Sequence, residues 1–124
     1  MSLSARPPAK NIRLKRAYER ATPDDGARIL VDRLWPRGVT KADAAIDRWE
    51  RDLAPSAALR KWFGHDPARW SEFQRRYRKE LNTHADLIAE LRGLARKGLL
   101  TLVYGARDEE HNDAVVLRDV LLKG

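Results

Sequence analysis

The chain has 124 residues and no cysteine, and its 25 Lys and Arg residues outnumber its 18 Asp and Glu residues, for a net charge of +7. This length suits one domain with its own core, and the lack of cysteine excludes disulfides, thiolate nucleophiles and cysteine metal sites. No apolar run approaches the roughly 20 residues that cross a bilayer, so we expect a cytoplasmic protein without membrane contact. The basic charge favours an anionic partner, either a small molecule or a nucleic acid, and leaves the oligomeric state open.

The first half of the chain predicts an arm followed by two strands. Residues 1–11 are basic and contain a Pro-Pro pair, which predicts a flexible arm ahead of a single domain over residues 12–124. Residues 12–19 alternate, with Ile12, Leu14 and Tyr18 on one side, as in a half-buried strand. After the turn residues at 22–26, the apolar run at 29–31 predicts a strand buried on both faces.

The next segments predict a loop and short helices. Residues 33–40 contain Pro36 and Gly38 and should be irregular, and residues 40–43 resemble a capping box that opens a short helix. Residues 46–53 fit either a helix or a strand, and we favour a short helix that becomes extended before Pro55. Ser56 is placed to cap a helix over residues 57–63.

The second half of the chain reads as helix, helix, strand and helix. Asp66 and Pro67 start a helix whose apolar residues recur every three or four positions to Leu81, and a second such helix ends at Gly98. Residues 99–104 predict a second buried strand, and residues 114–122 a final helix. This order predicts an α/β fold, with a small, mostly parallel central sheet and covering helices in a single domain.

Ligands of open α/β sheets bind beyond the carboxyl ends of the strands, and both buried strands lead into unusual loops. Arg33 and Arg37 flank Trp35 in the first loop, where guanidinium groups could bind an anion beside an indole wall. Alternatively, Trp35 packs in the core and Arg33 pairs with Asp32 or Asp108. If the strands are parallel neighbours, the two loops meet over one crevice.

The second loop carries acids and one of the three histidines. We expect Asp108, Glu109 and Glu110 at the start of the last helix, where carboxylates stabilise the helix dipole. These acids would repel an anion bound at that helix end. They could also pair with the arginines of the first loop. His111, and secondly His65, could transfer protons near neutral pH, although a hydrogen-bonded structural role suits both. The histidines lack metal-ligand spacing, so we predict no metal site and no cofactor.

Residues 74–79 are strongly basic. On a helix, Arg75, Arg76, Arg78 and Lys79 would lie opposite Phe73 and Tyr77. A solvated helix face explains this pattern, and a phosphate-contacting surface is the functional alternative.

Several ordered motifs carry a family resemblance. Asp32–Gly38, Leu53–Ser56, Leu59–Asp66 and Tyr104–Asp108 resemble the YeaO-like bacterial proteins, the domain of unknown function 488 group, as do His111 and Asn112. The resemblance spans residues 12–123. It implies a compact α/β fold in which both loops and residues 49–65 form one surface, and it supplies no reaction. Other branches of the group carry cysteine and histidine near the last strand, where this chain has Gly105 and Ala106.

The leading hypothesis is a crevice that binds a small anionic or nucleotide-like ligand, with an acid/base or hydrolytic activity as an extension. A nucleic-acid-binding module that uses the arm and Arg75–Lys79 is the alternative, and a protein-interaction or structural role is a third. The expected ligand-binding residues are Arg33, Trp35, Arg37, Arg60, Trp62, His65, Tyr104 and Asn112, and the expected catalytic residues are His111 and Asp108.

Overall fold

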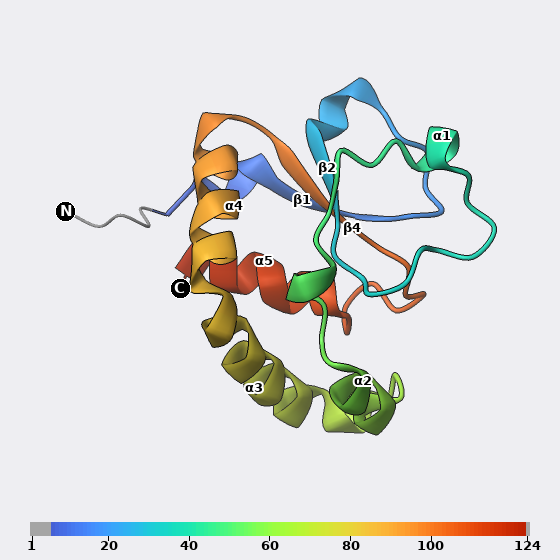
Figure 1. Cartoon of the computed structure of the whole chain (residues 1–124), viewed down its shortest axis with the longest axis vertical. Coiled ribbons are helices and arrows are strands. Elements are labelled where there is room, and N and C mark those ends of the chain that lie inside the picture. Colours follow the sequence, from blue (N-terminus) through green and yellow to red (C-terminus); the bar gives the residue numbers. More distant parts are fainter. Residues whose placement is uncertain (1–5, 124) are drawn as a thin grey trace.

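The computed structural model describes residues 6–123 and contains a parallel sheet with helices around it (Figure 1). The strands are β1 (Ile12–Arg16), β2 (Ala27–Leu30), β3 (Arg48–Trp49) and β4 (Leu100–Tyr104). The helices are α1 (Lys41–Ala44), α2 (Ala57–Phe63), α3 (Trp70–Leu81), α4 (Ala85–Lys97) and α5 (Asp113–Lys123). Of the predicted arm, residues 1–5 lie outside the described residues, and Ala9–Asn11 form a 3-10 turn before β1.

The sheet has the order β1-β4-β2-β3, and every pair of neighbouring strands is parallel. The predicted α/β fold with a small parallel sheet is therefore confirmed. β4 lies at the centre, and all five of its residues are buried. This burial explains its continuous apolar sequence, because a central parallel strand is covered on both faces.

The two faces of the sheet are covered by different parts of the chain. Ile29 and Leu102 belong to the main core, which they share with α3, α4 and α5. Their neighbours Leu30 and Val103 point the other way, into a smaller cluster that Trp35 and Trp49 cover. This alternation follows the period of two in a strand. The loops that follow β2 therefore form one layer, and the helices form the other.

Residues 46–53 correct the prediction of a short helix. The main chain pairs with β2 instead, because Asp47 N donates to Arg28 O and Glu50 N donates to Leu30 O, both at 2.9 Å. The result is the short strand β3, followed by a 3-10 turn at Arg51–Leu53. The local sequence suited both conformations, and hydrogen bonding to β2 decided between them.

Two further predictions were wrong in detail. Tyr18 was expected on the buried side of the first strand, but it is exposed and lies past the end of β1. Asp108–Glu110 were expected at the start of the last helix, but α5 begins at Asp113, so these acids lie in the preceding loop. In contrast, the caps are confirmed: the Ser56 side chain accepts from Leu59 N at the start of α2.

A buried carboxylate fixes the entry to β2. Asp25 is completely buried and accepts hydrogen bonds from Thr22, from Lys15 Nζ at 3.1 Å and from Arg28 NH1 at 2.8 Å. Burial would raise the pKa of Asp25, but these donors outweigh it and lower the pKa to about 2. The carboxylate therefore stays ionised and joins β1 to β2.

Within residues 6–123, no helix combines the length and the apolar character needed to span a membrane.

Candidate ligand-binding cleft

A cleft of about 830 Å³ lies at the carboxyl ends of β2 and β4. The β2–β4 pairing continues one residue beyond β2, where Val31 N donates to Val103 O at 3.1 Å, so the loops that follow both strands leave the sheet side by side. The cleft is lined by the loop after β2, by α2 with the segments on either side of it, by Phe73 of α3, by the segment after β4 and by the start of α5. The shared crevice predicted from strand order is therefore present.

Two tryptophans hold the loop after β2 in place. Trp49 Nε1 donates to Asp32 O and Trp35 Nε1 donates to Val39 O, both at 2.7 Å, and the two indoles meet edge to face at 5.5 Å. Trp35 also lines the cleft. Trp35 therefore fits both interpretations, because it packs against the smaller cluster and also lines the cleft.

A pair of carboxyl groups lines the same cleft. Asp32 directly follows the buried run that ends at Val31, and its Oδ2 accepts from Gly105 N at 2.8 Å. A Cβ atom at position 105 would lie only 3.2 Å from that oxygen, so glycine permits the close approach. The Asp113 side chain, in the first turn of α5, is hydrogen-bonded to the Asp32 side chain. Burial, and then the charge and hydrogen bond of Asp32, raise the pKa of Asp113 well above its ordinary value.

Three cations face this cleft without an acidic partner. Arg33, Arg60 and Lys61 all line it, and none of them forms an ion pair with another described residue. The Arg60 Nε atom is buried and has no hydrogen-bond partner. A buried donor without a partner is rare and costs free energy, so Arg60 is the cation best placed to gain from an anionic ligand.

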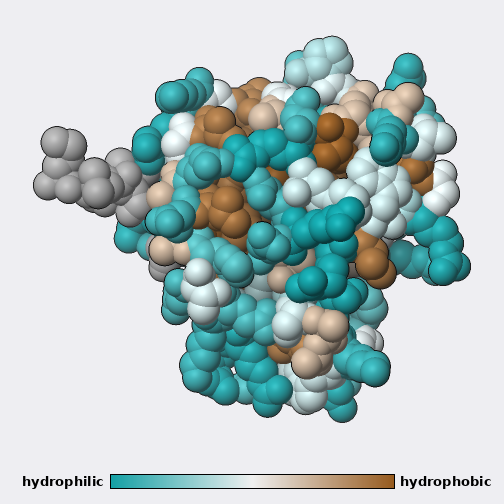
Figure 2. Space-filling view, in the orientation of Figure 1, coloured by the Kyte–Doolittle hydropathy of each residue, from teal (hydrophilic) through white to brown (hydrophobic). Residues whose placement is uncertain are grey.

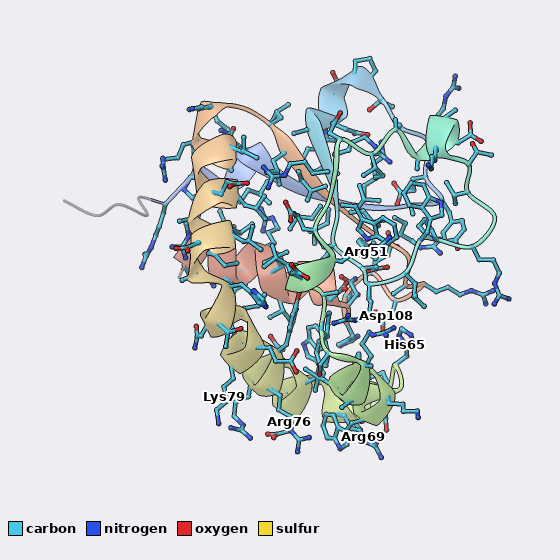
Figure 3. All side chains as sticks on the ribbon, viewed as in Figure 1. Arg51, His65, Arg69, Arg76, Lys79 and Asp108 are labelled. Atoms are coloured by element: carbon cyan, nitrogen blue, oxygen red, sulfur yellow. The ribbon has the colours of Figure 1, made fainter. Side chains whose placement is uncertain are left out.

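His65 reaches the cleft through an unusual backbone. Gly64 ends α2 in the left-handed conformation, and His65 follows it with a φ of 56°. A non-glycine residue in this region is uncommon and costs free energy. Its exposed imidazole lines the cleft, and Figure 3 shows it beyond the end of α2.

Arg33, Trp35, Arg60, His65 and Asn112 are the expected ligand-binding residues that the structure brings to the cleft. Its lining excludes Arg37, Trp62 and Tyr104. Trp62 lies under the guanidinium groups of Arg69 and Arg76, which Figure 3 shows on α3 and the turn before it. Tyr104 is buried and hydrogen-bonded to the Asn112 side chain.

The expected catalytic pair lies outside the cleft lining and is occupied with its own loop. His111 Nδ1 lies 2.9 Å from Asp108 Oδ2, and the imidazole meets the Trp70 ring edge to face at 5.1 Å. Asp108 Oδ1 also accepts from the backbone N–H groups of Glu110 and His111. Hydrogen bonds from the Glu110 backbone and the His111 side chain lower the pKa of Asp108. This geometry matches the structural alternative for His111.

The basic side of α3 carries fewer unpaired charges than its sequence suggests. Arg75 and Arg76 both pair with Glu72, and Arg78 pairs with Asp119 on α5. Lys79 is exposed, as Figure 3 shows, and Figure 2 shows a largely hydrophilic surface over α3. Two carboxylates therefore offset half of the four positive charges that would contact a phosphate.

Sequence reasoning missed Asp32 and Asp113 as site residues. The position of Asp32, directly after a strand buried on both faces, was the available signal, because that position opens onto the ligand-binding edge of a parallel sheet. Asp113 carries no comparable signal, since an acid in the first turn of a helix is ordinary. No group of three or more His, Cys, Asp or Glu in the described part of the chain could hold a metal ion.

The sequence of the chain matches a known family over nearly its whole length. The chain is a member of the YeaO-like DUF488 family of small α/β proteins. Its branch has the description "Inactive DUF488-N3 subclade", which the chain matches over residues 11–124. The resemblance noted in the sequence is thereby confirmed.

Relatives in Escherichia coli and Mycobacterium tuberculosis cover nearly the whole chain. The uncharacterized protein YeaO of Escherichia coli is 44% identical over 111 residues, which cover 90% of this chain and 96% of YeaO. The uncharacterized protein Rv3073c of Mycobacterium tuberculosis is 44% identical over 110 residues, which cover 89% of this chain and 92% of the relative. No solved structure matches the chain.

Proposed function

We propose that this protein binds a small molecule with an anionic group and an apolar body, in the cleft at the carboxyl ends of β2 and β4. The observation that carries the proposal is the set of three cations, Arg33, Arg60 and Lys61, which line a cleft of about 830 Å³ without acidic partners among the described residues. That volume lies in the range of small-molecule sites, roughly 300–1,000 Å³. Trp35 and Phe63 add aromatic walls.

Two observations favour binding over catalysis. The Asp108–His111 pair, which was the best acid/base candidate, does not line the cleft. The description of the family branch as inactive also supports a protein that recognises a ligand without transforming it.

The ion pairs of Arg75, Arg76 and Arg78 favour the cleft over α3 as the place where an anion binds.

The test is a thermal-shift screen with nucleoside monophosphates, sugar phosphates and aromatic carboxylates, followed by calorimetry of each hit. A ligand that binds only the folded state stabilises it and therefore raises Tm. At a ligand concentration of 100 times Kd, the free energy of unfolding increases by about 2.7 kcal/mol. We expect the double variant Arg33→Ala/Arg60→Ala to weaken binding at least ~10-fold, because a hydrogen bond to a charged group contributes about 1.5–3 kcal/mol.

The matched control is Arg20→Ala. Arg20 is an exposed arginine outside the cleft lining, so its removal changes the net charge by the same amount per residue and should leave the affinity unchanged. A screen without hits, or hits that bind the double variant as tightly as the parent protein, would refute the proposed function.

A further inference from the structure

The cleft contains a second polar feature, of opposite sign to its cations. Asp32 and Asp113 line the same cavity as Arg33, Arg60 and Lys61, yet neither carboxyl group forms an ion pair with any residue from 6 to 123. Both signs of charge are therefore present and uncompensated within one cavity. Such an arrangement is suited to a ligand that itself carries both signs.

We propose that the ligand is an amino-acid-like zwitterion, whose ammonium group binds the Asp32–Asp113 pair and whose carboxylate binds Arg33, Arg60 and Lys61. The inference rests on the proposed function and specifies its ligand class. The apolar body of the ligand lies against Trp35, Phe63 and their apolar neighbours in the cleft lining.

The hydrogen bonding of the pair supports the ammonium group. Two carboxylates that lie together repel each other, and a cationic group between them relieves that repulsion. One oxygen of Asp32 is used by Gly105 N. An ammonium group offers three donors to the oxygens of the pair, and it brings the positive charge that the described residues do not supply to the pair.

The cations of the cleft support the other half of the ligand. A ligand with only negative charge would satisfy Arg60 but would be repelled by the carboxyl pair, and a ligand with only positive charge would be repelled by Arg33, Arg60 and Lys61. A zwitterion meets attraction at both ends. The Arg60 Nε–H, which is buried and has no partner, can donate a hydrogen bond to the ligand carboxylate.

The experiment compares matched ligands that differ only in the ammonium group. The probes are L-tryptophan with indole-3-propanoate, L-phenylalanine with 3-phenylpropanoate, and L-leucine with 4-methylpentanoate, each titrated calorimetrically at pH 7. We expect the amino acid of at least one pair to bind ~10-fold more tightly than its partner, which lacks the ammonium group.

The variant Asp32→Asn/Asp113→Asn removes the charge of the pair and keeps an oxygen to accept from Gly105 N. It should abolish the preference for the amino acid and change the affinity of the partner acid by less than ~3-fold. If the double variant does not fold, the parent protein titrated with each amino acid and with its N-acetyl derivative tests the same preference, because acetylation removes the positive charge of the ammonium group. Asp24→Asn, at an exposed aspartate outside the cleft lining, is the control and should keep the preference.

Each of the other outcomes is decisive. If the acids without an ammonium group bind as tightly as the matching amino acids, and this binding is lost in Arg33→Ala/Arg60→Ala, the proposal of a zwitterionic ligand is wrong. The proposed function would then remain intact. The same holds if neither series binds while the phosphates or aromatic carboxylates of the screen do. If no compound of either experiment binds, both proposals fail.

Discussion

Replacing Asp25 by alanine should be the most damaging change of a single acidic residue, because its carboxylate compensates a buried guanidinium. Arg28 is only 3% exposed, and its NH1 donates to Asp25 Oδ2 at 2.8 Å, whereas its NH2 is buried without a partner. Without Asp25, Arg28 keeps only the hydrogen bond from Nε to Ala44 O. Removing one member of a buried ion pair typically costs about 3–5 kcal/mol, and we expect that loss here.

The loss of stability at acid pH gives an independent value for the free energy that ionised Asp25 contributes to folding. The pKa of Asp25 is lowered from 3.8 to about 2 in the folded protein. A lowered pKa means that the folded state binds the proton more weakly than the unfolded state, so the stabilisation is complete above pH 3.8 and is lost as the pH falls toward 2. At about 1.4 kcal/mol per pH unit, the difference corresponds to about 2 kcal/mol.

The assay is urea unfolding, followed by tryptophan fluorescence, at pH 7 and at intervals down to pH 2. Asp24→Ala removes the neighbouring exposed carboxylate and should change the stability by less than ~0.5 kcal/mol. Asp25→Ala/Arg28→Met should recover part of the loss, because it also removes the uncompensated charge. A loss below ~1 kcal/mol for Asp25→Ala would show that water or side-chain rearrangement compensates Arg28, and the reasoning would be wrong.

Three other changes have expected outcomes that follow from the structure. Asp113 has a raised pKa in the folded state, so its contribution to stability falls as the pH rises above its unfolded value; Asp113→Asn should remove that decline, which unfolding at pH 5 and pH 7 would measure. Gly26→Ala should cost more than ~2 kcal/mol in chemical unfolding, because a Cβ would lie 2.2 Å from Leu99 O and the φ is +63°; a near-neutral result would mean that this backbone contact yields easily. Tyr77→Phe should cost about 1–3 kcal/mol, because the buried Leu53 carbonyl loses the hydrogen bond from the phenol; an unchanged urea midpoint would contradict this.

Local signals in the sequence predicted most of the elements well. Ser56 and Gly98 lie at the ends of helices as expected, because capping groups satisfy backbone donors and acceptors within a few residues. The apolar runs at 29–31 and 99–104 likewise correspond to β2 and β4. Residues 46–53 were assigned to the wrong class, since their apolar spacing fits two periods and their partner, β2, lies about twenty residues away in the chain.

The candidate site was predicted in location but only partly in composition. The rule that parallel strands present their carboxyl ends at one edge was sufficient to place the loops after Val31 and Val103 together. It could not show that His111 turns to Asp108 and Trp70, or that Trp62 packs under arginines. Those choices depend on side-chain contacts between elements, which leave no pattern in the sequence.

The sequence alone determined the α/β class, most of the helices and strands apart from β3, and the edge of the sheet where a ligand would bind, because caps, apolar periods and parallel topology depend on neighbouring residues and general geometry. Only the tertiary structure decided that Asp32 meets Asp113 across 81 positions of the chain and that Arg33 and Arg60 have no acidic partner among residues 6–123. Electrostatic pairing depends on distance and burial in space, and neither quantity is encoded in the spacing of residues along the chain.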